Sequence, residues 1–414
     1  MLCLSALGLT QTTRWNAQDL RTLKSLSLNR LEPLAPDPTN RVSDDIAAAR
    51  LGHMLFFDVR LSGNGEVSCA TCHDPKKNFT DGQSLAEGMG TAGRNTPSIV
   101  GSGHSKWLFW DGRADSLWAQ ALGPLEAAAE HGTNRMFVLR LVAQHYREDY
   151  EAIFGPLPAL VSQPRYPQVE SAFSSDEAQS AWKSLPDAAQ RAVNRVFANV
   201  GKAIAAYERR VNPGLTRFDA YIGSLASSDT KNNAALTPSE TNGLELFIGK
   251  AGCVSCHNGP LLTDGLFHNT DVPPNRDLET ADIGRAGGLL DLLNSDFNCK
   301  SWLSDAPNRC AKLEQAKSEL GGQGGEATTG VNAFKTPSLR GVAQTAPYMH
   351  AGQFSNLRRV LEHYSNAPNA EQNDSELRPA NLTTGEIADL EAFLKTLSAA
   401  PIAPTQFLKD PFRP

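Results

Sequence analysis

The sequence contains the pattern Cys-x-x-Cys-His twice, as Cys69-Ala70-Thr71-Cys72-His73 and as Cys253-Val254-Ser255-Cys256-His257. This spacing attaches c-type haem: the two thiols form thioethers with the porphyrin, and the histidine ligates the iron. Each cofactor needs its own protein pocket, so two copies of the motif constrain the chain to at least two structural units. The pair of motifs predicts two covalently bound haem c groups.

Two other kinds of site use the same residue types. A thioredoxin-type redox pair needs a strand–helix–strand context, and a structural zinc site takes four thiolates from two such motifs. No strand-like alternation of any length occurs in this sequence. The histidine after each cysteine pair and the helical surroundings of both motifs favour haem over either alternative.

Composition limits the remaining possibilities. A chain of 414 residues is long enough for two or three domains. The formal net charge of −6 and the scattered distribution of the 39 lysines and arginines give no basic surface for nucleic acid. No stretch approaches the roughly 20 apolar residues that span a bilayer, so no membrane span is expected. The apolar residues 1–9 resemble the remnant of a signal peptide, which favours a periplasmic location.

Three cysteines lie outside the two motifs. In an oxidising compartment Cys299 and Cys310 could close a short disulfide loop, which would stabilise the protein by about 2 to 3 kcal/mol. The alternative is a pair of buried, reduced thiols. Cys3 belongs to the apolar opening segment, and its neighbours do not form a lipid-attachment site.

Helical periodicity dominates the chain. Ser43 is expected to cap a helix that runs to about Phe57, and apolar residues recur at helical spacing over 135–154 and 193–211. Capping boxes predict two further helices, at Thr237 and Thr383. The predicted fold class is mainly α, with two cytochrome c-like helical domains, each around one haem. The expected divisions are a leader and extended segment (1–40), an N-terminal domain (41–212) and a C-terminal domain (213–414) with an insertion (275–330).

The second axial position of each iron decides what the haem can do. An iron with both axial positions filled by protein mainly transfers electrons, whereas an open position can bind peroxide or oxygen. Besides the methionines and tyrosines, the candidates for these positions are His53, His104, His131, His145, His268, His350 and His363.

From about Leu51 to Leu397 the chain resembles the bacterial di-haem cytochrome c peroxidase and MauG superfamily. The resemblance rests on the two haem motifs together with several longer strings. These strings are Leu55-Phe56-Phe57-Asp58, Arg94-Asn95-Thr96-Pro97-Ser98, Phe109-Trp110-Asp111-Gly112-Arg113, Phe334-Lys335-Thr336-Pro337-Ser338-Leu339-Arg340 and Thr345-Ala346-Pro347-Tyr348-Met349-His350.

The resemblance implies different tasks for the two haems: the first reacts with hydrogen peroxide and the second stores electrons. It implies that His73 and His257 are their proximal ligands. Trp110 matches the family's tryptophan between the haems. Gln120 and Glu130 match the glutamine and glutamate of the distal pocket, where the glutamate moves a proton between the two oxygens of peroxide.

The resemblance also implies one calcium ion between the haems. Asn95, Thr345 and Pro347 match the positions that hold it. An amide oxygen and two backbone carbonyls are hard donors that suit this cation, and water would fill the remaining coordination positions.

Two positions select the branch of the superfamily. No histidine lies between Asp74 and Gly103, where many peroxidases of the family carry a removable ligand, so the first haem is expected to be open, with Met89 as the alternative ligand. Tyr364 stands fourteen residues after His350, at the place of the family's axial methionine. Tyrosine at this place is the MauG pattern, and a phenol should stabilise iron in high oxidation states better than a thioether.

The predicted function is therefore that of a MauG-like enzyme, which uses hydrogen peroxide to form a bis-ferryl state and then oxidises a tryptophan of a partner protein. The segment before Phe334 resembles that of MbnH, a member that converts a partner's tryptophan to kynurenine, and its Trp302 is a candidate relay. Ala251 replaces a tryptophan of MauG, so the exit route for oxidising equivalents should differ.

Two alternatives stay open. One is a di-haem cytochrome c peroxidase that reduces hydrogen peroxide to water with electrons from a small cytochrome c or cupredoxin. The other is a cytochrome that only transfers electrons, which an open first haem would disfavour.

Overall fold

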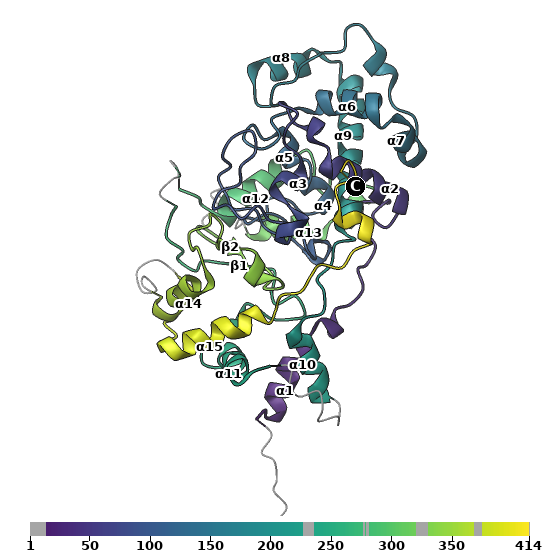
Figure 1. Ribbon diagram of the computed structural model, residues 1–414. Coiled ribbons are helices and arrows are strands. Elements are labelled where there is room, and N and C mark those ends of the chain that lie inside the picture. Colours follow the sequence, from purple (N-terminus) through teal and green to yellow (C-terminus); the bar gives the residue numbers. More distant parts are fainter. Residues whose placement is uncertain are drawn as a thin grey trace, which may run out of the picture.

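The computed structural model describes residues 14–226, 236–275, 278, 281–319, 330–367 and 375–413. Cys3 and the apolar opening segment lie outside these residues. In the described part the chain is mainly helical, as predicted (Figure 1). None of the described helices combines the length and the apolar character that crossing a membrane requires.

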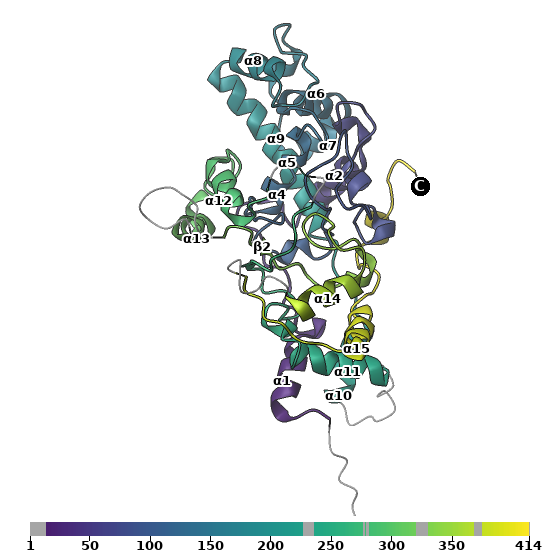
Figure 2. The same cartoon turned by 90° about the vertical axis from the view of Figure 1, so that its left-hand side faces the viewer.

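Helices α6 to α9 lie at one end of the molecule and α1, α10, α11 and α15 at the other, and helices such as α4, α5, α12 and α13 lie between them (Figures 1 and 2). The helices up to residue 208 are α1 (Ala17–Ser25), α2 (Ile46–Phe57), α3 (Cys69–Cys72), α4 (Leu117–Gln120), α5 (Gly123–Glu126), α6 (Arg135–His145), α7 (Arg147–Phe154), α8 (Asp176–Ser184) and α9 (Asp187–Glu208). The later helices are α10 (Arg217–Ala226), α11 (Pro238–Ile248), α12 (Arg285–Asn294), α13 (Ala311–Glu319), α14 (Leu357–Asn366) and α15 (Thr384–Lys395). Two short antiparallel strands, β1 (Phe267–His268) and β2 (Phe334–Lys335), pair with each other.

The first core forms where α2 and α4 cross α9, and glycine allows both crossings. A Cβ on Gly52 of α2 would overlap the carbonyl oxygen of Ala203, and one on Gly201 of α9 would overlap the carbonyl oxygen of Trp118. The helix backbones therefore touch, and the large aromatic residues pack around the contact. Trp118 itself is fully buried.

The second core is built on α11 and α15, which also meet at a glycine, Gly243. Each of these helices begins at a capping box, as the sequence predicted: Thr237 accepts a hydrogen bond from the N–H of Glu240, and Thr383 accepts one from the N–H of Glu386. These boxes satisfy backbone donors that would otherwise lack partners at the helix ends.

Each end of the described chain packs in the core that lies farther from it in the sequence: the N-terminal end in the second core and the C-terminal end in the first. Near the N-terminal end, Trp15 lies in the second core and its indole donates a hydrogen bond to the hydroxyl of Tyr221 over 2.7 Å. Near the C-terminal end, Phe407 lies in the first core, where its carbonyl accepts a hydrogen bond from Tyr207 over 2.9 Å. The predicted leader segment thus contains a folded helix, α1.

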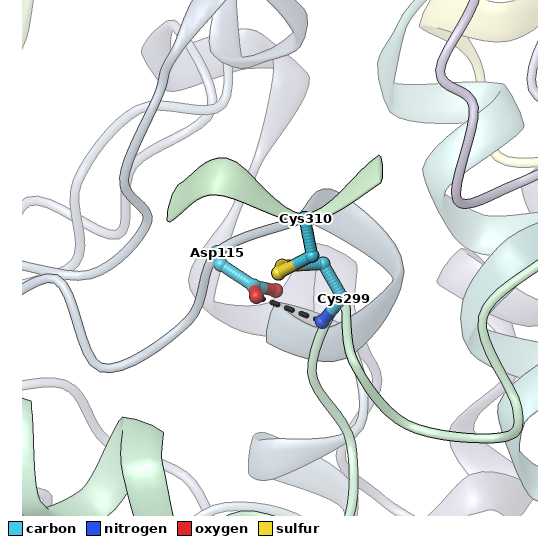
Figure 3. Close-up of side chains that lie close together, drawn as sticks. All are labelled: Asp115, Cys299 and Cys310. Atoms are coloured by element: carbon cyan, nitrogen blue, oxygen red, sulfur yellow. Dashed lines mark hydrogen bonds between the residues drawn. A yellow bond between two sulfur atoms is a disulfide. The ribbon is translucent and has the colours of Figure 1, made fainter. Parts of the chain in front are cut away.

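The segment that carries α12 and α13, which we call the excursion (residues 281–319), packs on the side of the first core (Figure 2). Of the two alternatives for Cys299 and Cys310, the structure contains the disulfide. Figure 3 shows Asp115 beside this disulfide, where its carboxylate accepts a hydrogen bond from the N–H of Cys299 over 2.8 Å. The excursion is thereby attached to the segment that precedes α4.

Two helix predictions need correction. The N-cap of α2 is Asp45, not Ser43, because the Asp45 carboxylate accepts hydrogen bonds from the N–H groups of the first turn. The predicted helix over 135–154 is interrupted at Tyr146, whose hydroxyl donates a hydrogen bond to Asp58 over 2.7 Å. This contact with a distant segment outweighs the continuous helical periodicity. Helix α8 was not predicted at all.

A pair of helical glycines tests the packing of the first core. Gly52→Ala should lower the free energy of unfolding by about 1 to 3 kcal/mol, because the added methyl group displaces α9. Gly223→Ala in α10, where a Cβ meets no atom within 4 Å, should raise it by up to about 1 kcal/mol through helix propensity. Thermal unfolding of both variants measures the difference. Equal effects would contradict this packing.

Candidate haem sites

Helix α3 presents the first motif, and a short turn after it orients the histidine. The Nδ1 atom of His73 lies 3.1 Å from the carbonyl oxygen of Phe79. Because a carbonyl only accepts, Nδ1 must carry the proton and Nε2 is left as a free ligand atom. Burial lowers the pKa of His73, which keeps the imidazole neutral, as iron ligation requires.

The second motif repeats this arrangement in the other core. The Nδ1 atom of His257 lies 3.0 Å from the carbonyl oxygen of Leu262, and burial lowers the pKa of this histidine too. Cys253 and Cys256 form no disulfide. The donor set of each motif therefore fits one haem c: two free thiols for the thioethers and one oriented imidazole for the iron.

The zinc alternative does not fit this geometry. Cys69 packs against the first core and Cys253 against the second, and the metal-ligand groupings among the described residues contain no set of four sulfurs. Burial also raises the pKa of Cys69, which disfavours the thiolate that zinc needs. The thioredoxin alternative needs a strand–helix–strand unit around the motif, whereas the described strands, β1 and β2, have two residues each and pair antiparallel with each other.

Glu130 lies on the loop between α5 and α6, close to the first motif. Its backbone carbonyl accepts a hydrogen bond from the N–H of Met89 over 2.9 Å. The next residue, His131, is buried, with Nε2 3.8 Å from the sulfur of Cys69. Burial raises the pKa of Glu130, and the nearby guanidinium of Arg113 opposes this shift. The loop thus presents a carboxyl group that can hold a proton beside the first motif.

Met89, the alternative ligand of the first iron, packs on the outside of this loop. A Cβ added to Gly132 or Gly63 would meet its sulfur, and 42% of the residue is exposed. Gln120 ends α4, where its N–H donates a hydrogen bond to the carbonyl of Ser116 over 3.0 Å. Its role in a distal pocket stays a prediction, as does the open position on the first iron.

Tyr364 lies on α14, beside the second motif. Burial raises the pKa of its phenol to about 12, a hydrogen bond with the side chain of Thr270 opposes this shift, and the charges of Cys253 and Cys256 add to it. Leu357 and Leu361 of α14 pack in the second core, which Cys253 of the motif also contacts. The structure thus brings together the residues that the sequence assigned to the second haem.

Trp110 lies where the two halves of the molecule meet. Its indole N–H donates a hydrogen bond to the carbonyl of Asn95 over 3.0 Å, and its own carbonyl accepts one from the N–H of Lys335 over 2.8 Å. The N–H of Asn95 in turn bonds the carbonyl of His350 over 2.8 Å. Trp110 is therefore tied to segments from both halves.

The predicted calcium ligands lie in the same region. The contact with His350 brings Asn95 to the turn that carries Thr345 and Pro347. The side-chain N–H of Asn95 bonds the carbonyl of Gln83 over 2.8 Å, so its amide oxygen faces away from that partner. Calcium binding here stays a prediction.

Most of the other candidate histidines already have partners. The ring nitrogens of His268 lie 2.6 Å from Glu376 and 2.9 Å from Asp264, so both are occupied by carboxylates. His53 contacts the carbonyl of Lys409, and His363 that of Thr270, each over 2.8 Å. These contacts favour structural roles.

Sequence reasoning missed the two carbonyl groups that orient the motif histidines. Phe79 and Leu262 adopt left-handed backbone conformations, with φ of 59° and 54°, which are rare for bulky residues. No residue type at either position signals such a conformation. The unusual backbone follows only from the turn that returns each carbonyl to its histidine.

Comparisons with known proteins agree with this geometry. The sequence profile of the family described as di-haem cytochrome c peroxidase matches residues 46–226. The chain is 32% identical to the cytochrome-c peroxidase IdrP2 of Pseudomonas sp. (strain SCT), with 99% of this chain and 94% of that protein covered. It is 32% identical to the methylamine utilization protein MauG of Methylorubrum extorquens, with 96% and 90% covered.

Solved structures give the same picture. A MauG-like protein associated with microbial copper homeostasis superposes with a TM-score of 0.61 and 26% identity, covering 93% of this chain and 99% of that chain. The diheme peroxidase BthA from Burkholderia thailandensis superposes with a TM-score of 0.61 and 23% identity, covering 92% of each chain. The second likeness concerns the fold alone.

The motif assignment predicts the haem content of matched variants. The double variant Cys253→Ala/Cys256→Ala should retain one covalent haem per chain, because only the first motif can still form thioethers. The double variant Cys299→Ala/Cys310→Ala removes the same number of cysteines, which form a disulfide instead, and should retain two covalent haems. The pyridine haemochrome assay and intact-protein mass spectrometry measure this content. Two covalent haems in the first variant would contradict the assignment.

Proposed function

Because the chain belongs to the di-haem cytochrome c peroxidase and MauG family, we propose that it uses hydrogen peroxide to oxidise a tryptophan of a partner protein. Members of this family are oxidoreductases that act with peroxide and carry two haem c groups. The observation that carries this proposal is the position of Tyr364 on α14, a helix that packs in the same core as Cys253 of the second motif. His73 and His257 would hold the two irons.

Bound haem would supply irons that react with peroxide and store its oxidising equivalents. The protein side chains control where protons go. Glu130, as a carboxylate, would accept the proton of the peroxide oxygen nearer the iron and return it to the farther oxygen, which then leaves as water. Its burial beside the first motif supports this role, and Gln120 is proposed to complete the same pocket.

Tyr364 would donate its phenolic oxygen to the second iron. A phenolate is a stronger electron donor than a thioether, so it favours the oxidised iron. The hydrogen bond with Thr270 supports the anionic form of the phenol, since it lowers the pKa that burial raises. This arrangement suits an iron that retains oxidising equivalents rather than one that only delivers electrons.

Trp110 would carry charge between the two haems. Its indole N–H bonds a backbone carbonyl, whose partial negative charge stabilises a positive charge on the ring. Trp302, the other candidate relay, is exposed, and the guanidinium of Arg195 lies 5.1 Å from its ring centre. This cation opposes positive charge on Trp302, so Trp110 is the better carrier.

Three further proposals concern a metal ion, the location and the partner of the enzyme. Asn95, Thr345 and Pro347 would hold a calcium ion close to Trp110. A periplasmic location is supported by the disulfide between Cys299 and Cys310, because disulfides persist mainly in oxidising compartments. The similarity to a MauG-like protein associated with microbial copper homeostasis supports a partner protein that handles copper.

A second candidate function is the reduction of hydrogen peroxide to water with electrons from a small cytochrome c or cupredoxin. The relative named cytochrome-c peroxidase IdrP2, at 32% identity over 99% of this chain, favours it. The two functions differ in what the fully oxidised enzyme can do. The first needs no prior electron, whereas the second begins with reduction of the storage haem.

Replacement of Tyr364 tests the proposed function. In the native protein, one equivalent of peroxide added to the fully oxidised enzyme should produce a near-infrared absorption that arises from charge shared between the haems. Tyr364→Met should abolish this absorption with both haems still attached, because a thioether stabilises the oxidised iron less well. Tyr150→Phe, which removes a buried phenol from the first core, should leave it unchanged. Persistence of the absorption in Tyr364→Met would contradict the proposal.

Replacement of Glu130 tests the proton transfer. Glu130→Gln should slow the reaction with peroxide by roughly a hundredfold or more, since general acid–base groups contribute factors of this order. In the native enzyme the carboxylate is the active form. The rate should therefore fall as the pH falls through the pKa of Glu130, which burial raises above its ordinary value of 4.5. Stopped-flow absorption measurements at pH values from about 4 to about 9 determine both the rate of the variant and the pH dependence of the native enzyme. An unchanged rate in Glu130→Gln would exclude this role.

A further inference from the structure

Arg135 closes the base of the loop that carries Glu130. It begins α6, and its guanidinium binds both carboxylate oxygens of Glu126 at the end of α5, each over 2.8 Å. The side chain of Arg135 is 6% exposed. The two charged residues therefore flank residues 127–134 and hold the ends of the loop together.

Hydrogen bonds within the loop transmit this restraint to Glu130. The carbonyl of Ala127 accepts hydrogen bonds from the N–H groups of Glu130 and Gly132, over 3.0 and 2.9 Å. The N–H and the hydroxyl of Thr133 both bond the carbonyl of Leu125, over 3.0 and 2.8 Å. A tightly wound loop of this kind moves as a unit, so a shift at its base also shifts Glu130.

Aromatic rings fix the guanidinium from the other side. Asn194 of α9 accepts a hydrogen bond from Nη1 of Arg135 over 2.9 Å. Four aromatic rings surround the guanidinium group of Arg135 and restrict its orientation. The rings are Phe173 at 4.1 Å, Phe297 at 4.9 Å, Trp182 at 5.1 Å and Phe197 at 5.7 Å.

One of these rings comes from the excursion. Phe297 is buried against Phe197, with ring centres 5.5 Å apart. It stands two residues before Cys299, whose disulfide and hydrogen bond to Asp115 fix this part of the excursion (Figure 3). Asp296 also reaches Arg135, at 3.5 Å. The excursion thus forms one wall of the site that holds the arginine.

We propose that Arg135 is a positioning residue for the carboxyl group of Glu130, and that Phe297 makes this positioning depend on the excursion. The proposal rests on the proposed role of Glu130 in proton transfer. A lysine at position 135 would keep the charge but lose the planar fork that binds Glu126 at two points. The loop would then loosen and admit water.

The groups around Glu130 determine whether its pKa should rise or fall in the Arg135→Lys variant. Arg113 is the cation that acts on it, His131 is its buried neighbour, and the sulfurs of Cys69 and Cys72 become uncharged thioethers once haem is attached. Water in a loosened loop would reduce the desolvation that raises the pKa of Glu130. That pKa should therefore fall, and the acidic limb of the pH–rate profile should move to lower pH.

The test uses the enzyme with both haems attached, as verified by the pyridine haemochrome assay. Arg135→Lys should slow the reaction with one equivalent of peroxide by roughly tenfold to a hundredfold, because small misplacements of a reacting group have costs of this size. It should also move the acidic limb to lower pH. Phe297→Leu should produce a smaller change in the same direction.

Arg140→Lys is the matched control. Arg140 lies on the same helix, contacts Gln168 and the ring of Phe137, and takes no part in the Glu126 contact. This variant should match the native enzyme in rate and in pH profile.

The outcomes separate the inference from the proposed function. A slow Glu130→Gln variant together with native rates and native pH profiles in Arg135→Lys and Phe297→Leu would overturn the positioning role alone. An unchanged Glu130→Gln variant would overturn the role of Glu130 and the positioning role with it. If Arg135→Lys fails to incorporate haem, the pH profile of Phe297→Leu decides, and an unshifted acidic limb would contradict the proposal.

Discussion

Each motif histidine donates its Nδ1 proton to a backbone carbonyl, His73 to that of Phe79 and His257 to that of Leu262. This hydrogen bond selects the tautomer, leaves Nε2 for iron and fixes the plane of the ring relative to the two thiols. It depends on a backbone turn that is unfavourable for bulky residues. The surrounding core has to hold that turn in place. The orientation of the ligand histidines therefore depends on the packing of the helices.

The two halves of the chain, one built around His73 and the other around His257, hold different candidate functional groups. The first half places the Glu130 loop beside Cys69, and the second half places Tyr364 on α14, a helix of the core that Cys253 contacts. Trp110 is held between them by hydrogen bonds to both halves. The crossing of the chain ends and the packing of the excursion on the first core both join the halves.

Local patterns in the sequence predicted what local chemistry determines. The capping boxes at Thr237 and Thr383 depend on residues within three positions of one another, and both were predicted correctly. The haem motifs are equally local, and the family to which the chain belongs implies the two haem groups that they predict. The break at Tyr146, the burial of Trp15 in the second core and the closure of the Glu130 loop by Arg135 depend on contacts between distant segments. The bond between Trp15 and Tyr221, for example, spans 206 residues. No short pattern encodes such a contact, so these features required the structure.

The central claim is an asymmetry between the two irons: the first keeps an open position for peroxide, and the phenol of Tyr364 closes the second. Low-temperature electron paramagnetic resonance of the fully oxidised holoprotein tests it most directly. The account predicts one high-spin ferric haem and one low-spin ferric haem in equal amounts. The optical spectrum of the same sample should lack the absorption that a thioether ligand produces. Two low-spin haems, or a thioether signature on the second iron, would contradict it.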